Sequence, residues 1–144
     1  MADTRLIIHV NLIDSIEDIT REDVERALSL VAEEEGVTEG EVSVTFLDER
    51  AMAVLNETHL GRAGTTDVIA FNLGERDAPL GDVYICPEVA EGSALDYGVE
   101  LREELLRLVV HAALHLFGHE HPEGPERRDS EMFRLQEAIL ARLI

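Results

Sequence analysis

The sequence lacks lysine and tryptophan and contains only one cysteine, Cys86. A single thiol forms no disulfide within the chain, so Cys86 is expected to be a small buried hydrophobe in a strand. A catalytic thiol is the less favoured alternative, because no histidine adjoins it in the sequence. No apolar run is long enough to span a membrane, and the first ten residues have the alternation of a strand and not the pattern of a signal peptide. These absences predict a cytoplasmic protein with no membrane partner.

Positive charge is also scarce. The 12 basic residues, all arginine, are outnumbered by 31 acidic residues, and the formal net charge is −19. Such a charge repels a polyanion, and nucleic-acid binding is largely electrostatic. Charges more than about 8 Å apart interact weakly at physiological salt, so an RNA-binding protein of this composition needs a local cationic pocket. Arginine suits that pocket because its guanidinium binds phosphate in a bidentate manner. A second hypothesis is that the acidity reflects adaptation to a salty cytoplasm.

The chain contains a regular succession of apolar patterns. Alternating and short apolar segments predict four strands, at residues 5–13, 41–47, 67–71 and 80–86. Helical spacing, capping residues and stop glycines predict five helices, at residues 21–36, 49–61, 88–97, 101–117 and from 131 onward. The first two strands are expected to be parallel because a helical crossover joins them, and the last two to form an antiparallel hairpin. We therefore expect a single α+β domain over residues 1–144, in which a mixed four-stranded sheet is flanked by about five helices, with a central helix that carries histidines.

Four of the six histidines lie in the stretch HAALHLFGHEH, from His111 to His121. His111 and His115 are four residues apart, so on a helix their imidazoles project from the same face and can bind one ion. Gly118 predicts a left-handed helix end that lets the chain fold back and bring His121 to the same ion. His119 remains an alternative third ligand, because it is in phase with His115 if the helix continues past Gly118.

Three neutral imidazoles predict one zinc ion per chain, in a site of the catalytic type that keeps an open coordination position. Such an ion lowers the pKa of bound water to about 7 and polarises a phosphoryl or carbonyl oxygen. The ligand spacing also matches that of the metzincin peptidases. However, Ala112 occupies the position where these enzymes carry their general-base glutamate. A metallopeptidase is therefore an alternative in which another residue, such as Glu120, acts as the base.

The histidine stretch resembles the signature HGxLHLxGYDH of the YbeY family of bacterial metal-dependent endoribonucleases. Three positions differ, since Ala112 replaces glycine, His119 replaces tyrosine and Glu120 replaces aspartate. Three other segments resemble family segments: TTDVIAFNLG at 65–74, LGDVYICPE at 80–88 and EMFRLQEAIL at 131–140. The similarity covers most of the chain from about residue 55 onward, in the family's order.

The resemblance implies a zinc-dependent endoribonuclease that hydrolyses single-stranded RNA. It implies a role in 3′-end maturation of small-subunit ribosomal RNA and in ribosome quality control. The implied partners are the ribosomal RNA precursor and small-subunit ribosomal proteins, and not DNA. A non-catalytic, zinc-stabilised adaptor associated with the ribosome is the remaining alternative, and it predicts that zinc removal destabilises the fold while the intact protein shows no hydrolytic turnover.

Three residues besides the histidines are candidates for the chemistry. Asp67 is a candidate to support the metal ligands, Glu120 to transfer protons and Arg62 to contact phosphate. The family usually has an arginine before the glycine of a stretch resembling YRGKD, and Leu60 stands at that position here. Arg62, two residues away, is the expected substitute.

Overall fold

The computed structural model describes residues 5–13, 16–75, 77–119 and 130–144. Within these residues it contains four strands and five helices, in the order β1 (Arg5–Asn11), α1 (Arg21–Glu35), β2 (Glu39–Phe46), α2 (Glu49–Leu60), β3 (Val68–Asn72), β4 (Leu80–Ile85), α3 (Pro87–Tyr97), α4 (Leu101–Leu116) and α5 (Glu131–Ala141). The strands form one sheet in the order β1-β2-β4-β3. β1 and β4 both pair with β2 in parallel, and β3 pairs with β4 in the antiparallel sense. The predicted α+β fold with a mixed four-stranded sheet is confirmed.

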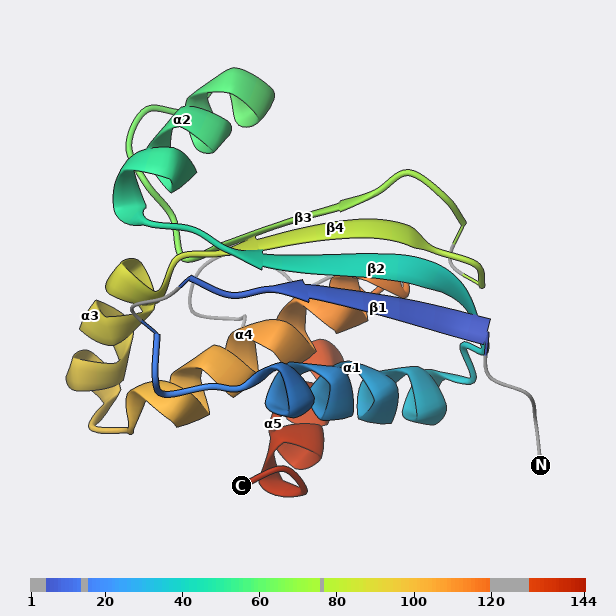
Figure 1. The fold of residues 1–144 in the computed structure, drawn as a ribbon. Helices are drawn as coiled ribbons and strands as arrows, with labels where there is room; N and C mark the ends of the chain where they lie inside the picture. Colours follow the sequence, from blue (N-terminus) through green and yellow to red (C-terminus); the bar gives the residue numbers. More distant parts are fainter. Residues whose placement is uncertain (1–4, 14–15, 76, 120–129) are drawn as a thin grey trace.

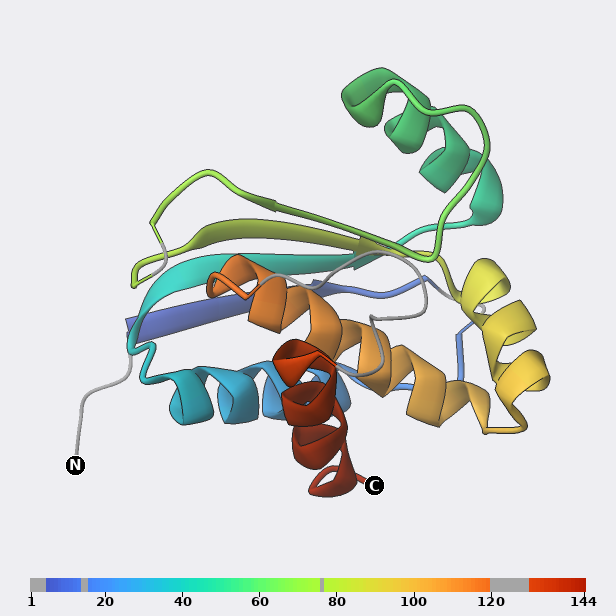
Figure 2. The same ribbon diagram turned by 180° about the vertical axis from the view of Figure 1, so that it is seen from behind.

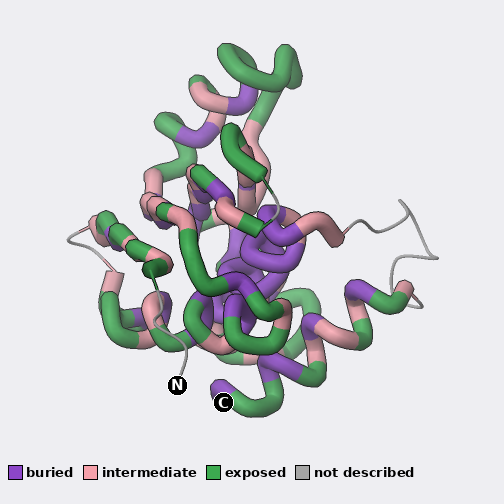
Figure 3. The backbone as a smooth tube through the Cα atoms, turned by 90° about the vertical axis from the view of Figure 1, so that its right-hand side faces the viewer, coloured by how far each residue is buried: buried purple, intermediate pink, exposed green. Residues whose placement is uncertain are grey.

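The helices α1, α3, α4 and α5 lie on one face of the sheet (Figures 1 and 2). α1 and α4 lie against the sheet, α5 packs on α4, and α3 packs beside α4. α2 lies beyond the ends of the strands and contacts α3, where the Glu49 backbone N–H donates to the Glu88 carboxylate at 3.0 Å. Eleven of the sixteen residues of α4 are buried, and buried segments gather at the centre of the molecule (Figure 3). The expected central position of the histidine helix is confirmed.

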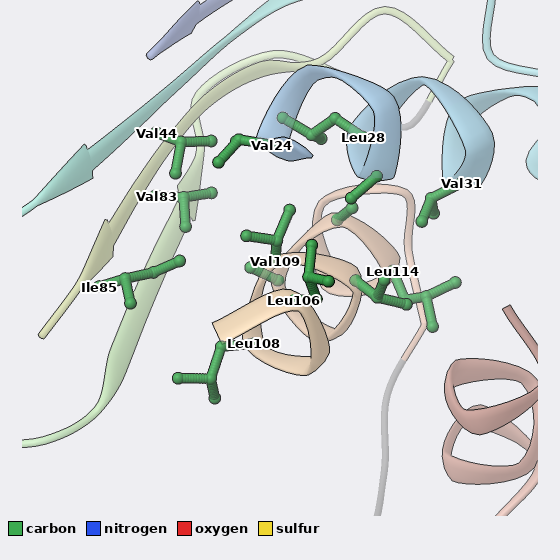
Figure 4. Packing of buried hydrophobic residues seen from close by; sticks show 14 of the residues in the cluster. Val24, Leu28, Val31, Val44, Val83, Ile85, Leu106, Leu108, Val109 and Leu114 are labelled. Carbon is green, nitrogen blue, oxygen red and sulfur yellow. The ribbon is translucent and has the colours of Figure 1, made fainter. Parts of the chain in front are cut away.

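The hydrophobic core holds α4 against both α1 and the sheet (Figure 4). Its labelled side chains come from α1 (Val24, Leu28, Val31), from the strands (Val44, Val83, Ile85) and from α4 (Leu106, Leu108, Val109, Leu114). Each of these side chains is at most 5% exposed, and burial of such a side chain stabilises the fold by about 1.5–3 kcal/mol. The core therefore holds the backbone of α4 in one position relative to the strands.

Local capping interactions define α1 and connect it to α4. The Thr20 hydroxyl accepts from the Asp23 backbone N–H at 3.2 Å, and the Asp23 carboxylate accepts from the Thr20 N–H at 2.9 Å. The same carboxylate accepts two hydrogen bonds from Arg102 in α4, one of them 2.9 Å long. The Arg102 guanidinium lowers the pKa of Asp23 to about 2. The helix then ends at Gly36, which has a left-handed φ of 69°, as the sequence predicts.

The C-terminal end of α4 is held close to the sheet. A Cβ atom on Gly81 of β4 would lie 2.7 Å from Leu116 Cδ1, so the absence of a side chain at Gly81 permits this approach. Asn72, the last residue of β3, donates from Nδ2 to the Leu116 carbonyl oxygen at 3.0 Å. Gly118 then has a φ of 100°, which is the predicted left-handed turn. The helix end that carries the histidine pair is thus fixed from the strands.

Candidate metal site

The two histidines of α4 lie side by side. Their Nε2 atoms are 3.1 Å apart, and their ring centroids are 4.6 Å apart with nearly perpendicular planes. His111 is buried, with 8% of its surface exposed, and His115 is half-buried. The four-residue spacing along α4 brings the rings together as the sequence predicts.

The turn after α4 orients His115. The His119 N–H donates to the Leu114 carbonyl at 2.9 Å, and this places the His119 carbonyl oxygen 3.0 Å from His115 Nδ1. A carbonyl oxygen can only accept a hydrogen bond. His115 Nδ1 therefore carries the proton, which directs the basic Nε2 toward His111.

Gln136 orients His111 in the same way, and the sequence analysis did not identify this residue. Gln136 lies on α5, is 4% exposed, and its Oε1 is 2.6 Å from His111 Nδ1. Its amide nitrogen donates to the Glu137 carboxylate at 3.0 Å, so the atom that faces His111 is the amide oxygen. His111 Nδ1 must then donate the proton. The available signal was a polar residue on the apolar face of the last helix, between Met132 and Ile139.

This arrangement fits a cation. With both Nδ1 atoms protonated, both Nε2 atoms present lone pairs 3.1 Å apart, and such a pair is stable when a proton or a metal ion lies between the nitrogens. Two histidine ligands of a tetrahedral zinc, each about 2.0–2.1 Å from the ion, are about 3.3 Å apart. Residues His111 and His115 therefore fit as two zinc ligands. No third His, Cys, Asp or Glu joins them in the part of the chain that the structure describes, and His121 and Glu120 lie outside that part.

His119 is engaged elsewhere. Its Nε2 pairs with the Glu35 carboxylate at the end of α1, so its ring is directed to α1 and its carbonyl to His115. α4 ends at Leu116, and the alternative that required the helix to continue past Gly118 is wrong. Outside α4, His9 is exposed, and its Nε2 lies 2.6 Å from Glu41 Oε1.

A cavity of about 480 Å³ opens on the β3 side of the histidine pair. We call it the β3-side cavity. It is lined by His111, His115, Ala112, Arg62 and Leu60, with residues of β3 and its preceding loop. Among the described residues that line it, Arg62 is the only charged one and none is an Asp or a Glu. The predicted phosphate contact Arg62 therefore shares a cavity with both predicted ligands.

A second cavity, of about 290 Å³, lies on the other side of His111, against α5. We call it the α5-side cavity. Its lining includes the carboxylates of Asp67, Glu104 and Glu137 and the guanidinium of Arg107. Arg107 donates to Glu104 at 2.8 Å and makes two bonds to Glu137, at 2.9 and 3.1 Å. Burial raises the pKa of Glu104 above its ordinary value.

The structure thus separates two residues that the sequence analysis grouped together. Asp67 lines the α5-side cavity and Arg62 the β3-side cavity, and His111 lines both. Asp67 comes just before β3 and Arg62 just after α2, so the loop between them passes from one cavity to the other.

Cys86 is fully buried in a small second core with Met52 and Ile69. Burial raises the pKa of its thiol above the ordinary value, so the thiolate is disfavoured. The expected burial of Cys86 is confirmed, but its expected place in a strand is wrong by one residue, because β4 ends at Ile85 and Cys86 is the N-cap of α3.

Comparison with known proteins places the chain in a family. The family model described as endoribonuclease YbeY matches residues 9–144. The endoribonuclease YbeY of Geobacillus kaustophilus is 37% identical, with 95% of this chain and 97% of the relative covered. That of Beutenbergia cavernae is 43% identical over 71% of this chain and 73% of the relative.

A solved structure agrees with this result. The solution structure of TM1509 from Thermotoga maritima superposes with a TM-score of 0.70 at 28% identity, and the match covers 95% of this chain and 89% of that one. None of the helices that the structure describes has the length and apolar character to cross a membrane. The resemblance seen in the sequence is confirmed, and the chain belongs to the endoribonuclease YbeY family.

Proposed function

We propose that this protein is a zinc-dependent endoribonuclease that hydrolyses single-stranded RNA. The relatives named endoribonuclease YbeY support the reaction class. The observation that carries the metal dependence is the 3.1 Å approach of His111 Nε2 to His115 Nε2, with each Nδ1 proton donated to a fixed oxygen. His121 is the proposed third ligand, because the ring of His119 is bound to Glu35.

The scissile phosphate enters the β3-side cavity in this proposal. That cavity contains both histidines and the Arg62 guanidinium, whereas the α5-side cavity contains three carboxylates around one guanidinium. A phosphate is attracted to the first environment and repelled by the second. Screening over about 8 Å lets this local difference outweigh the net charge of −19.

The residues of this chain have distinct roles in the proposed hydrolysis. Zinc, when bound, would activate water and polarise the phosphoryl oxygen. His111 and His115 hold the ion, and Gln136 and the His119 carbonyl keep their Nε2 atoms deprotonated. Arg62 neutralises phosphate charge. Proton transfer by Glu120 and support of the ligand shell by Asp67 are further parts of the proposal.

The lining of the β3-side cavity disfavours the metallopeptidase alternative. Ala112, which stands at the position of the peptidase base, lines this cavity. Its methyl group cannot accept a proton. A peptidase mechanism would therefore depend on another base, and the candidate for that role, Glu120, lies outside the described residues.

The biological setting is part of the same proposal. We place the activity in the cytoplasm, in 3′-end maturation of small-subunit ribosomal RNA and in ribosome quality control. The ribosomal RNA precursor is then the substrate, and small-subunit ribosomal proteins are the expected partners.

The test compares zinc content and RNA cleavage in four proteins: wild type, His111→Ala, His115→Ala and His9→Ala. The last is the control, since His9 is exposed and pairs with Glu41. We expect about one zinc per chain and cleavage of single-stranded RNA in the wild type and the control, and loss of both in the other two. Cleavage by the metal-free wild type at the full rate would refute the proposal. If zinc stabilises the protein but no RNA is cleaved at low or high salt, the adaptor hypothesis is favoured. If the protein cleaves casein in a metal-dependent manner but does not cleave RNA, the peptidase hypothesis is favoured.

A further inference from the structure

A chain of polar contacts continues behind His111, away from the metal side. His111 Nδ1 meets Gln136 Oε1 at 2.6 Å, and Gln136 Nε2 donates to Glu137 Oε2 at 3.0 Å. Arg107 then holds both oxygens of Glu137, through Nε at 2.9 Å and through a terminal nitrogen at 3.1 Å. The chain of contacts leaves α4 at His111 and returns to α4 at Arg107.

The orientation of the Gln136 amide determines which nitrogen of His111 carries the proton. With the amide oxygen toward His111, Nδ1 must donate and Nε2 keeps its lone pair. An amide rotated by 180° has nearly the same shape but presents its NH₂ group. Nδ1 would then have to accept, and the proton would move to Nε2, where it blocks the lone pair that faces His115.

The carboxylate of Glu137 selects between these two orientations. It can only accept, so it pairs with the amide nitrogen of Gln136 and leaves the oxygen for His111. The bidentate contact with Arg107 fixes the carboxylate in the position where it makes this selection. We propose that Glu137, held by Arg107, is a positioning residue that fixes the tautomer of His111 through the Gln136 amide.

The effect of Glu137 on the His111 tautomer follows from these polar contacts alone. The expected effect on metal affinity rests, in addition, on the proposed function. Residues that hold the non-coordinating nitrogen of a ligand histidine typically change metal affinity by about 10–100-fold when replaced. Glu137 acts one residue further from the ion, through Gln136. We therefore expect an effect near the lower end of that range.

Glu103 offers a matched control for Glu137. Arg107 donates to Glu103 at 3.2 Å, and the structure gives Glu103 no contact with Gln136. The variants Glu137→Gln and Glu103→Gln both remove one carboxylate charge from Arg107. Only Glu137→Gln offers Gln136 an amide that can donate as well as accept, so only this variant permits the rotated orientation.

The experiment measures the His111 tautomer by ¹H–¹⁵N NMR of the metal-free protein at pH 8, and zinc affinity by chelator competition. We expect His111 Nδ1 to carry a proton in the wild type and in Glu103→Gln. In Glu137→Gln we expect His111 with an unprotonated Nδ1 to appear and zinc affinity to fall by about tenfold. The exchange variant Gln136→Glu/Glu137→Gln restores both, because a carboxylate at position 136 can only accept from His111 and the amide introduced at position 137 can donate to that carboxylate.

Three results would overturn the proposal: an unchanged tautomer in Glu137→Gln, an equal loss of zinc affinity in Glu103→Gln, or no recovery in the exchange variant. The exchange variant also covers the case in which Glu137→Gln folds poorly, since it keeps the same composition as the wild type. Wild-type protein with the expected tautomer but without zinc binding would refute the proposed function and leave the tautomer claim intact. If all variants bind zinc with equal affinity, the expected effect of Glu137 on zinc affinity is refuted, but its effect on the His111 tautomer is not.

Discussion

On the β3 side of His111 the described lining carries one charge, that of Arg62, whereas on the α5 side the carboxylates of Asp67, Glu104 and Glu137 surround Arg107. One imidazole lies between these two environments. Its Nε2 meets His115 and its Nδ1 meets Gln136. The difference teaches that a chain of net charge −19 can still present a described surface without carboxylates beside the histidine pair, while three carboxylates lie on the other side of His111.

The largest expected effect is the loss of zinc binding and RNA cleavage in His115→Ala, in contrast to His119→Ala. His115→Ala removes a proposed zinc ligand that lines the β3-side cavity, so zinc binding and RNA cleavage should fall to background. His119→Ala should keep both, because the His119 ring binds Glu35 and only its carbonyl supports His115. Zinc analysis and a cleavage assay check this. Loss of zinc from His119→Ala would make His119 a ligand and contradict the assignment of His121.

Arg62→Ala tests whether the β3-side cavity binds phosphate. The loss of a charged hydrogen bond, about 1.5–3 kcal/mol, should lower kcat/KM by at least about tenfold. It should also reduce the slope of log affinity against log salt by about 0.7. Arg50→Ala is the matched control, because Arg50 lies in the first turn of α2 and lines neither cavity. Equal effects of the two variants would mean that only the overall charge matters.

Leu60→Arg sharpens the same comparison by adding charge to the β3 side. Leu60 lines the β3-side cavity and is 40% exposed at the last position of α2, so an arginine there can reach the cavity without disturbing the core. We expect kcat/KM at low salt to rise by a factor of about five or less, as for an exposed ion pair worth roughly 1 kcal/mol or less. Leu95→Arg, on the exposed surface of α3, controls for the added charge and should leave the rate unchanged.

The smallest effect on activity is expected for Asp23, which lies outside both cavities. Its folded-state pKa of about 2 lies below the ordinary value of 3.8. The pair with Arg102 therefore stabilises the fold fully above pH 3.8, and this contribution disappears as the pH falls through 2. At pH 7, Asp23→Asn should lower the free energy of unfolding by about 1–2 kcal/mol, with RNA cleavage unchanged. Urea unfolding of the wild type and Asp23→Asn at pH 7 and pH 2.5 measures this difference in the free energy of unfolding. If the difference at pH 2.5 is as large as at pH 7, the ion-pair explanation is contradicted.

Local signals made most of the fold predictable from the sequence. Thr20 and Asp23 form a capping box and Gly36 a left-handed stop, and each of these acts within one helical turn of its own position. The histidine pair is equally local, because four residues make one helical turn. The order of the strands was not predictable. β4 pairs with both β2 and β3, and alternation within one strand does not specify its neighbours.

The surroundings of the histidines depend on contacts between distant segments, which a single sequence does not display. Gln136 is 25 residues from His111, and it was visible only as a polar residue on an apolar helix face. The separation of Arg62 from Asp67 arises because their connecting loop passes from one cavity to the other. The ligand role of His121 and the proton-transfer role of Glu120 stay predictions, since both residues lie outside the described part of the chain.

The most direct test of the account is to locate bound RNA by NMR. A short 2′-O-methyl RNA, which lacks the free 2′-hydroxyl groups, is titrated into the zinc-loaded, ¹⁵N-labelled protein. The account predicts that the largest shift changes occur at Arg62, Val68 and Ala70, which line the β3-side cavity. Changes centred instead on Phe133 and Glu137 of the α5-side cavity would contradict the central claim that the phosphate binds on the side of the histidines from which the described carboxylates are absent.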